Sequence, residues 1–230
     1  MNQKKVWFVI VTYRPEQEAL RRLITAIHEW PTEVVDNTDK NLGYGGGANK
    51  GMKKAFDAGA RWVVVVNQDV TLTKVGIAKF VRALEECGPG VVGPEAGSLD
   101  PKRWTTILAS RPALEAGRLD SRLRGNDNLS YISGSLMAIH RDVYKATGGF
   151  YGPYFMYYED ADLSVRAKKA GFELRQVIID GFGHETHGRA GKKYYLARNH
   201  LLFVFRNAPV SVKFHEILRL PKTLWESLWS

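Results

Sequence analysis

The sequence predicts an α/β fold of the Rossmann-like kind, with a mostly parallel central sheet and helices on both faces. Its 230 residues are 44% apolar and 25% charged, which suits a soluble globular domain with a sizeable core. Short continuous runs rich in Val and Ile, typical of strands buried on both faces, alternate with segments of helical periodicity. This alternation is the pattern of a parallel, helix-covered sheet.

Three strands and three amphipathic helices are expected in the first 90 residues. The strands are the apolar runs 6–11, 33–36 and 62–66. The helices, in which apolar residues recur every three or four positions, are 16–30, 45–58 and 73–87. The last helix is followed by Gly88-Pro89-Gly90, a helix stop, and a fourth strand begins at Val91.

The second half of the chain is expected to be less regular. Residues 97–130 are rich in Gly, Pro, Arg and Asp, and predict a long functional loop. The elements expected after it are strands at 131–140 and 174–179 and helices at 160–170 and 194–205. Two short amphipathic stretches follow Pro209, so we divide the chain into a domain at 1–208 and a C-terminal amphipathic helical extension at 209–230.

Composition limits the class and location of the protein. Cys87 is the only cysteine, which excludes an internal disulfide framework and favours the cytoplasm. The apolar run 6–11 is too short for a signal peptide, and no run approaches the roughly 18 residues of a membrane span. The net charge of +9, skewed toward the C-terminus, suits a polyanion: a diphosphate, a nucleic acid or an anionic membrane face.

Polar residues follow each of the first three expected strands, where ligands collect in open α/β sheets. They are Thr12-Tyr13-Arg14, Asp36-Asn37 and Asn67-Gln68-Asp69. A single Asp or Asn at such a point often caps a helix or makes a turn, but three such sites on one edge favour a binding site. Asp69 is a hard oxygen ligand placed where a divalent ion could join it to a diphosphate.

A glycine-rich segment at 41–51 offers backbone that can approach a ligand closely at the mouth of a helix. It matches Gly-x-Gly-x-x-Ala through Gly43, Gly45 and Ala48. The dinucleotide fingerprint should follow the first strand directly, whereas this segment trails the second strand by about six residues. Its position therefore counts against a nicotinamide enzyme.

Two further groups of ionisable residues are candidates for chemistry. Glu159 and Asp160 stand at the start of the helix at 160–170, where carboxylates serve either as caps or in catalysis. His184 and His187 follow the last strand, and an imidazole there could complete a metal shell with Asp69. Their spacing is not that of a helical zinc pair, and the single cysteine excludes a Cys-rich zinc site.

Taken together, these motifs resemble the inverting glycosyltransferase family 2, especially its rhamnosyltransferase-like members. The resemblance covers roughly residues 6–207. The stretches that carry it are Val11-Thr-Tyr-Arg14, Val35-Asp-Asn37, Asn41-x-Gly43, Gly46-x-x-Asn49-x-Gly51, Asn67-Gln-Asp69, Ser133-Gly-Ser135, Gly148-Gly-Phe150, Glu159-Asp160-x-Asp162-Leu with Arg166, and Tyr195-x-x-Arg198-Asn199. Asn67 replaces the first acid of the family's Asp-x-Asp metal motif, which leaves the ion one charge short.

The resemblance implies a GT-A fold, a nucleoside diphosphate sugar donor and a Mn²⁺ or Mg²⁺ ion. It implies that Asp160, with Glu159 beside it, takes the proton of the acceptor hydroxyl. It also implies that Asp69 and either His184 or His187 hold the metal. The positions that it assigns to the donor are Thr12, Tyr13, Arg14, Asp36, Asn41, Gly43, Asn49, Asn67, Gln68 and Gly134.

The implied reaction transfers a sugar to a saccharide or a lipid-linked saccharide, as in polysaccharide and cell-wall biosynthesis. We expect dTDP-rhamnose as the donor, because Asn67-Gln68-Asp69-Val70 resembles the Asp-Gln-Asp form found among rhamnosyltransferases. The basic, aromatic C-terminal stretch is expected either to touch the inner membrane face or to pack on the domain or on a second subunit.

Two other classes of protein stay open. A nicotinamide-dependent oxidoreductase or a nucleotidyltransferase would use a similar sheet and a glycine-rich segment. A basic module could bind nucleic acid or polysaccharide, but its Lys and Arg form no recognisable motif with interleaved aromatics, and the acidic residues at 159–162 oppose a polyanion. We therefore expect no nucleic-acid partner.

Overall fold

The computed structural model describes residues 5–108, 129–184 and 192–229, and is centred on a six-stranded sheet in the order β10-β5-β9-β3-β1-β2. The strands are β1 (Val6–Thr12), β2 (Thr32–Asp36), β3 (Trp62–Asn67), β5 (Gly90–Gly93), β9 (Leu136–His140) and β10 (Glu173–Gln176). Within this sheet β9 runs antiparallel to its two neighbours, and the other pairings are parallel. The predicted mostly parallel sheet is confirmed.

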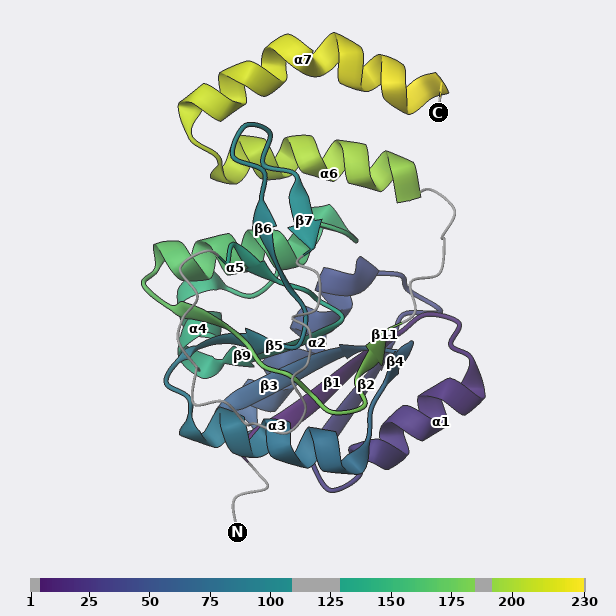
Figure 1. The fold of residues 1–230 in the computed structure, drawn as a ribbon. Helices are drawn as coiled ribbons and strands as arrows, with labels where there is room; N and C mark the ends of the chain where they lie inside the picture. The colour runs from purple at the N-terminus through teal and green to yellow at the C-terminus, as the bar shows by residue number, and fades with distance from the viewer. Residues whose placement is uncertain (1–4, 109–128, 185–191, 230) are drawn as a thin grey trace.

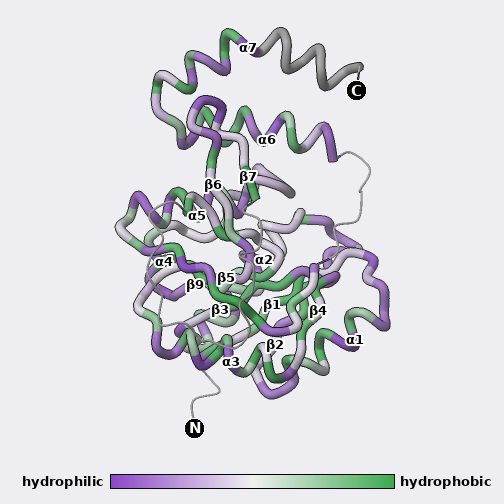
Figure 2. The backbone as a smooth tube through the Cα atoms, viewed as in Figure 1, coloured by the Kyte–Doolittle hydropathy of each residue, from purple (hydrophilic) through white to green (hydrophobic). Residues whose placement is uncertain are grey.

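Helices cover both faces of this sheet (Figure 1). On one face lie α1 (Gln17–Ala26) and α3 (Lys74–Glu86); on the other lie α2 (Gly43–Asp57), α4 (Arg141–Thr147) and α5 (Glu159–Lys169). Alternate residues of β1 supply the two cores, with Phe8 and Ile10 in one and Val9 and Val11 in the other. Figure 2 shows β1 and β3 as strongly hydrophobic segments at the centre of the molecule.

The first three strands end together at one edge of the sheet. Thr12 at the end of β1 pairs with Asp36 of β2, and Val11 pairs with Asn67 of β3. At this edge β4 (Val70–Thr71) pairs antiparallel with β11 (Gly183–His184), a short ribbon in which His184 lies opposite Val70. Residues far apart in the sequence thus reach the same edge.

The prediction of a loop at 97–130 is wrong for the first part of that range. A second sheet forms there from β6 (Ala96–Leu99), β7 (Thr106–Leu108) and β8 (Tyr131–Ile132), while residues 109–128 lie outside the described part of the chain. The single strand expected at 131–140 is divided by residues 133–135 into β8 and β9, which belong to different sheets. The pairing of β6 with β8 joins residues more than 30 positions apart, which a local pattern does not indicate.

Two long helices, α6 (Lys192–Asn207) and α7 (Val210–Trp229), lie above α5 (Figure 1). The two short stretches expected after Pro209 are one continuous helix, which packs on α6 through Val204, Ala208 and Val212. The division of the chain at residue 208 stays a prediction. None of the helices within the described residues is long and apolar enough to cross a membrane.

Candidate functional site

The predicted acidic pair lies where α5 begins. Asp160 Oδ2 accepts a hydrogen bond from the backbone N–H of Gly134 at 2.9 Å, and its Oδ1 accepts from the N–H of Ala161 at 2.8 Å. The Tyr44 hydroxyl, at the start of α2, donates to the carbonyl of Gly134. The structure therefore brings Gly134 and Asp160 together, and adds Tyr44, which sequence reasoning did not select.

Burial gives Glu159 and Asp160 an unusual electrostatic environment. Desolvation raises the pKa of Glu159, and the neighbouring charge of Asp160 raises it further. Desolvation also raises the pKa of Asp160, although the N–H groups of Gly134 and Ala161 oppose this by stabilising the carboxylate. Glu159 is 6% exposed, and its Oε2 has no hydrogen-bond partner among the described residues. Asp160 is thus the member of the pair whose ionised form is supported.

His184 joins two carboxylates at the edge of the sheet. Its Nε2 lies 3.6 Å from Asp69 Oδ1, and its Nδ1 lies 3.5 Å from Glu95 Oε2. The nearby carboxylates of Asp69 and then of Glu95 raise the pKa of His184 to about 9. Glu95 also accepts a hydrogen bond from Ser135 Oγ at 2.7 Å. This bond connects Asp69, His184 and Glu95 with the segment that contains Gly134.

The donor set at this point suits a divalent cation only in part. An imidazole and a carboxylate 3.6 Å apart can both bind Mn²⁺, and Mg²⁺ is commonly held by one or two carboxylates together with substrate phosphates. No cluster of three or more His, Cys, Asp or Glu suited to a metal ion is found in the part of the chain that is described. A metal here would need ligands from the substrate. His187 lies outside the described residues.

The residues predicted for the nucleotide form a second group, around the ends of β1 and β2. The backbone of Tyr13 is held by Gln68, whose Oε1 accepts from the Tyr13 N–H at 2.7 Å. Arg14 lies over the Tyr13 ring at 5.4 Å. The Asp36 carboxylate is exposed, and hydrogen bonds from Thr38 lower its pKa. Thr12 is only 2% exposed, so its hydroxyl faces the protein interior.

The glycine-rich segment serves packing as well as approach to a ligand. A Cβ on Gly47 would lie 2.7 Å from Val11 Cγ1, and one on Gly51 would lie 2.4 Å from Val9, so these glycines let α2 sit against β1. Asn49 exchanges two hydrogen bonds with the backbone of Phe150, at 2.7 and 2.9 Å. Both ends of the Asn49 amide therefore bond to protein backbone.

Other predicted donor residues lie close to the start of α2. The Oδ1 of Asn41 accepts a hydrogen bond from the N–H of Gly43 at 2.9 Å, and Gly43 is buried against the backbone of Phe155.

Another predicted donor residue, Asn67, lies at the end of β3. Its N–H donates to the carbonyl of Ser135, which connects the end of β3 with the segment before β9. Asn67 itself is half-buried.

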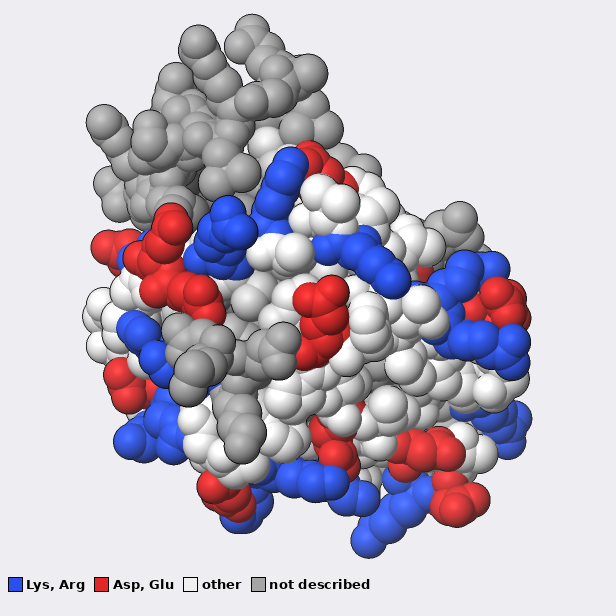
Figure 3. All heavy atoms as spheres, turned by 90° about the horizontal axis from the view of Figure 1, so that it is seen from below, with Lys and Arg blue, Asp and Glu red and all other residues white. Residues whose placement is uncertain are grey.

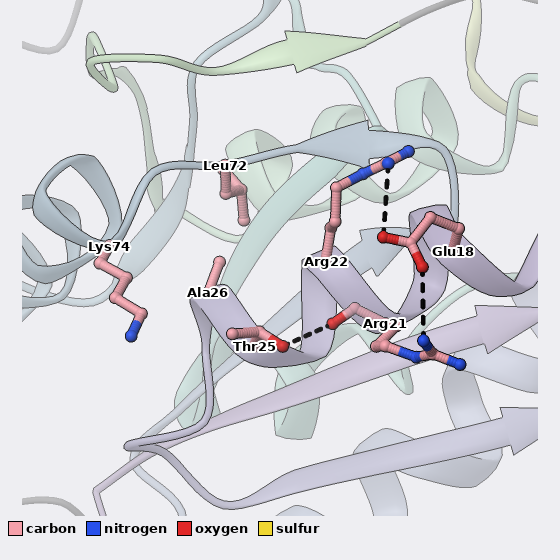
Figure 4. Close-up of a pocket in the computed structure, with 7 residues that line it drawn as sticks. All are labelled: Glu18, Arg21, Arg22, Thr25, Ala26, Leu72 and Lys74. Atoms are coloured by element: carbon pink, nitrogen blue, oxygen red, sulfur yellow. Dashed lines mark hydrogen bonds and ion pairs between the residues drawn. The ribbon is translucent and has the colours of Figure 1, made fainter.

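A separate depression of about 350 Å³ lies on the surface of α1 (Figure 4). Its lining includes Arg21, Arg22 and Lys74, and Glu18 forms ion pairs with both arginines. None of the predicted site residues lines it. We do not assign the function to this depression, because its cations are exposed and already partly neutralised.

Sequence reasoning missed Glu95 and Tyr44. Glu95 follows the parallel strand β5, so the rule that singled out Asp36 and Asp69 could have found it. Tyr44 lies inside the glycine-rich segment, which was interpreted through its glycines and not through this phenol. Burial and the charges of Glu159, Asp160 and Asp69 raise the pKa of Tyr44.

Comparison with known families and sequences gives a consistent result. A family model described as "Glycosyltransferase like family 2" matches residues 4–178. An uncharacterized protein of Mycobacterium bovis is 28% identical over 161 residues, which are 67% of this chain and 59% of that protein. The N-acetylglucosaminyl-diphospho-decaprenol L-rhamnosyltransferase of Mycobacterium tuberculosis is 29% identical over 211 residues, or 78% and 68% of the two chains. The chain thus spans little more than half of the first of these relatives.

Solved structures with a similar fold include two that were determined with a nucleotide sugar. The mannosyltransferase PcManGT from Pyrobaculum calidifontis, in complex with GDP-Man and Mn²⁺, has a TM-score of 0.52 and 14% identity, over 94% of this chain and 68% of that one. TarS 1-349 from S. aureus, in complex with UDP-GlcNAc, has a TM-score of 0.54 and 12% identity, over 90% and 68%. At these identities the likeness concerns the fold alone.

Proposed function

Because the chain belongs to glycosyltransferase-like family 2 and has the GT-A fold, we propose that it transfers a sugar from a nucleoside diphosphate sugar to a hydroxyl group of an acceptor. The observation that carries this proposal is the arrangement of two acidic groups around the segment 133–135. Asp160 is bound to Gly134 on one side, and Glu95, bound to Ser135, leads to His184 and Asp69 on the other. A base and a diphosphate site are the two parts that the reaction needs.

Asp160 is the base in the proposed mechanism. The acceptor oxygen attacks the anomeric carbon from the face opposite the diphosphate, the bond from carbon to the diphosphate oxygen breaks, and the acceptor proton passes to the Asp160 carboxylate. The raised pKa of Asp160 improves its match to this task, since a more basic carboxylate accepts a proton more readily. The N–H groups of Gly134 and Ala161 fix its orientation.

Asp69 and His184 are the residues that would hold a divalent cation. When bound, such an ion neutralises the charge that develops on the departing diphosphate. His184 must lose a proton before its Nε2 can bind a cation, and Asp69 lies at the distance from which it can share that cation. Glu95 then keeps the other ring nitrogen of His184 in place.

A donor-hydrolysis screen with Mn²⁺ tests the proposal. We expect nucleoside diphosphate release from dTDP-rhamnose above that from UDP- and GDP-sugars, since one similar protein is named an L-rhamnosyltransferase and the Asn67-Gln68-Asp69 motif has the related form. The structures of similar fold carry GDP-mannose and UDP-GlcNAc, so these two nucleotides belong in the screen. Release from no donor, together with thermal stabilisation by NAD, would contradict the proposal and favour an oxidoreductase.

We further propose that the acceptor is a saccharide or a lipid-linked saccharide, and that α7 brings the protein to a membrane surface. Val210, Phe214 and Leu218 follow one another at helical spacing on α7 and are 79%, 62% and 68% exposed. Lys213 on the same helix suits anionic headgroups. Co-sedimentation with anionic vesicles tests this: Phe214→Ser with Leu218→Ser should release the protein, whereas Ile107→Ser, an exposed apolar control on β7, should not.

The charge distribution on the face opposite α6 and α7 does not favour a nucleic-acid partner there. Figure 3 shows Lys and Arg interleaved with Asp and Glu over the described residues of the face opposite α6 and α7. Among the cations of the described residues, Lys53 forms an ion pair with Asp57 and Lys79 with Asp180. The net positive charge of the chain is therefore spread rather than gathered into a groove on this face.

A further inference from the structure

Three of the four residues before the acidic pair adopt an unusual backbone conformation. Phe155, Tyr157 and Tyr158 have φ values of 67°, 65° and 71°, in the left-handed region that residues with a Cβ rarely occupy. Tyr158 directly precedes α5, so the orientation of the Glu159 and Asp160 side chains at the start of the helix depends on this segment. Such a conformation persists only when the surrounding structure holds it.

One side chain of α6 supplies much of that hold. Asn199 is fully buried, and its Nδ2 donates to the carbonyls of Tyr154 at 2.8 Å, Met156 at 2.6 Å and Tyr157 at 3.0 Å. An amide has two N–H bonds, so one of them is shared between two carbonyls. Asn199 thus engages three backbone groups on both sides of the first left-handed residue.

Arg198 fixes the amide in this orientation. Its Nη1 donates to Asn199 Oδ1 at 2.9 Å, and its Nη2 donates to the carbonyl of Pro153 at 2.9 Å. Because the oxygen of the Asn199 side chain is occupied by a guanidinium donor, its nitrogen is left to face the carbonyls. Two adjacent residues of α6 therefore hold residues 153–157 from one side.

The same segment contacts the start of α2 from the other side. The carbonyl of Phe155 accepts a hydrogen bond from the N–H of Tyr44 at 2.7 Å, and the ring of Phe155 stacks on Tyr195 of α6 at 5.3 Å. Tyr44 in turn bonds to Gly134, the residue that holds Asp160. The left-handed segment therefore lies between α6 and the network that orients the proposed base.

We infer that Asn199 is a positioning residue for sugar transfer: it fixes the backbone of residues 155–158, three of which are left-handed, and thereby the place of the Asp160 carboxylate. This inference rests on the proposed function. Asn199 touches none of the reacting groups, so its loss should lower the rate at saturating donor and leave donor affinity unchanged. A purely structural role would lower stability without this selective effect on rate.

Asn207 provides a matched control on the same helix. It is 7% exposed, and its Nδ2 donates to Asp162 Oδ1 at 2.8 Å and to the carbonyl of Phe203 at 3.3 Å. Replacing either residue removes a buried amide from α6, but only Asn199 bonds to the left-handed segment. Asn199→Leu and Asn207→Leu should therefore lower the melting temperature by similar amounts.

The experiment compares the wild-type protein with Asn199→Leu, Asn207→Leu and the milder Asn199→Ser. We expect kcat to fall by about 10-fold to 100-fold in the Asn199 variants, because a small displacement of a reacting group carries a cost of that order. The dissociation constant for the donor nucleotide should stay within about twofold, and kcat of Asn207→Leu should stay close to the wild-type value. Amide exchange at residues 154–160 should become faster in Asn199→Ser and stay unchanged in Asn207→Leu.

The outcomes separate this inference from the proposed function. Near-normal kcat in folded Asn199→Ser, an equal loss in Asn207→Leu, or unchanged exchange at 154–160 in Asn199→Ser would each overturn the positioning role. Absence of transfer and of donor hydrolysis in the wild-type protein would instead overturn the proposed function, and the positioning role with it. If Asn199→Leu does not fold, Asn199→Ser decides.

Discussion

The site contains two acidic regions whose carboxylates have opposite electrostatic surroundings. Asp69 and Glu95 share one imidazole, with both acids within 3.6 Å of His184. Glu159 and Asp160 are adjacent and form no ion pair with a Lys, Arg or His of the described residues, and burial raises the pKa of both. The first region sets its carboxylates beside an imidazole, whereas burial in the second makes the charged form of the carboxylates costly.

This difference assigns the two regions to different chemistry. A carboxylate beside an imidazole suits the capture of a cation, and through it a diphosphate. A carboxylate with a raised pKa suits the acceptance of a proton. The hydrogen bonds from Gly134 and Ala161 then distinguish Asp160 from Glu159, because they stabilise only the Asp160 charge. A substitution in one region should therefore leave the chemistry of the other region intact.

The largest effect is expected from Asp160→Asn, which keeps the shape of the side chain and removes the base. Transfer should fall by about 10²-fold to 10⁴-fold, the usual contribution of a general base, while nucleotide and metal binding stay normal. Initial rates and nucleotide affinity measured on the same preparation check this. Asn also caps helices well, so the fold should survive.

Asp142→Asn is the matched control for that change. Asp142 stands in the first turn of α4, its side chain is 51% exposed, and it lies outside the site. Its replacement should leave transfer unchanged. Near-normal transfer in Asp160→Asn would eliminate Asp160 as the base and make Glu159 the residue to test.

The next largest effect is expected on thermal stabilisation by nucleotide and Mn²⁺, and it concerns the region of Asp69 and Glu95. A nucleoside diphosphate with Mn²⁺ at about 100 times its dissociation constant should stabilise the wild-type protein by about 2.7 kcal/mol, since it binds only the folded state. For a protein of this size that corresponds to a rise of about 5 to 10 °C in melting temperature. Asp69→Ala should lose the part of the rise that depends on Mn²⁺, measured by thermal unfolding with and without the ion.

The comparison is sharpened by measuring Asp160→Asn in the same way. Its Mn²⁺-dependent rise should equal that of the wild-type protein, because Asp160 belongs to the other region. A control for Asp69→Ala is Asp57→Ala, which removes an exposed carboxylate of α2. If Asp69→Ala kept the full rise with Mn²⁺, the cation would have to bind elsewhere.

The arrangement of strands, and through it one half of the site, could be predicted from the sequence. Runs such as 62–66 are apolar over a length that fits one strand, and the polar residues after them necessarily meet at one edge of a parallel sheet. This reasoning found Asp69. Asp160 came from the start of a helix together with the family resemblance.

The remaining parts depend on contacts that no local pattern contains. Glu95 matters because β11 brings His184 to it from 89 positions away along the chain. Asn199 matters because of three carbonyls that are more than 40 positions away. The left-handed conformations of Tyr157 and Tyr158 have no sequence signal either, since aromatic residues seldom adopt them.

The smallest effect on rate is expected from Glu159→Gln, and it tests the distinction inside the acidic pair. Burial and the charge of Asp160 raise the pKa of Glu159, so near neutral pH its carboxyl group holds its proton more firmly than an ordinary glutamate does. Gln resembles that protonated form in shape and charge. Transfer near neutral pH should therefore stay within a few-fold of the wild-type rate, and a loss comparable to that of Asp160→Asn would identify Glu159 as the base instead.

The same substitution should change stability in a pH-dependent way, with a sign fixed by the raised pKa. Between the ordinary Glu pKa and the raised value, the folded protein holds a proton that the unfolded chain has released, so wild-type stability falls as the pH rises through this window. Gln does not titrate, and Glu159→Gln should gain stability over the wild type at pH 8 to 9, by about 1.4 kcal/mol for each unit by which the pKa is raised. Near pH 4 the wild-type carboxyl is protonated in both states, so the gain should vanish. Thermal unfolding of both proteins at the two pH values measures the difference, and a gain that is larger at pH 4 than at pH 9 would mean that Glu159 is held in its ionised form.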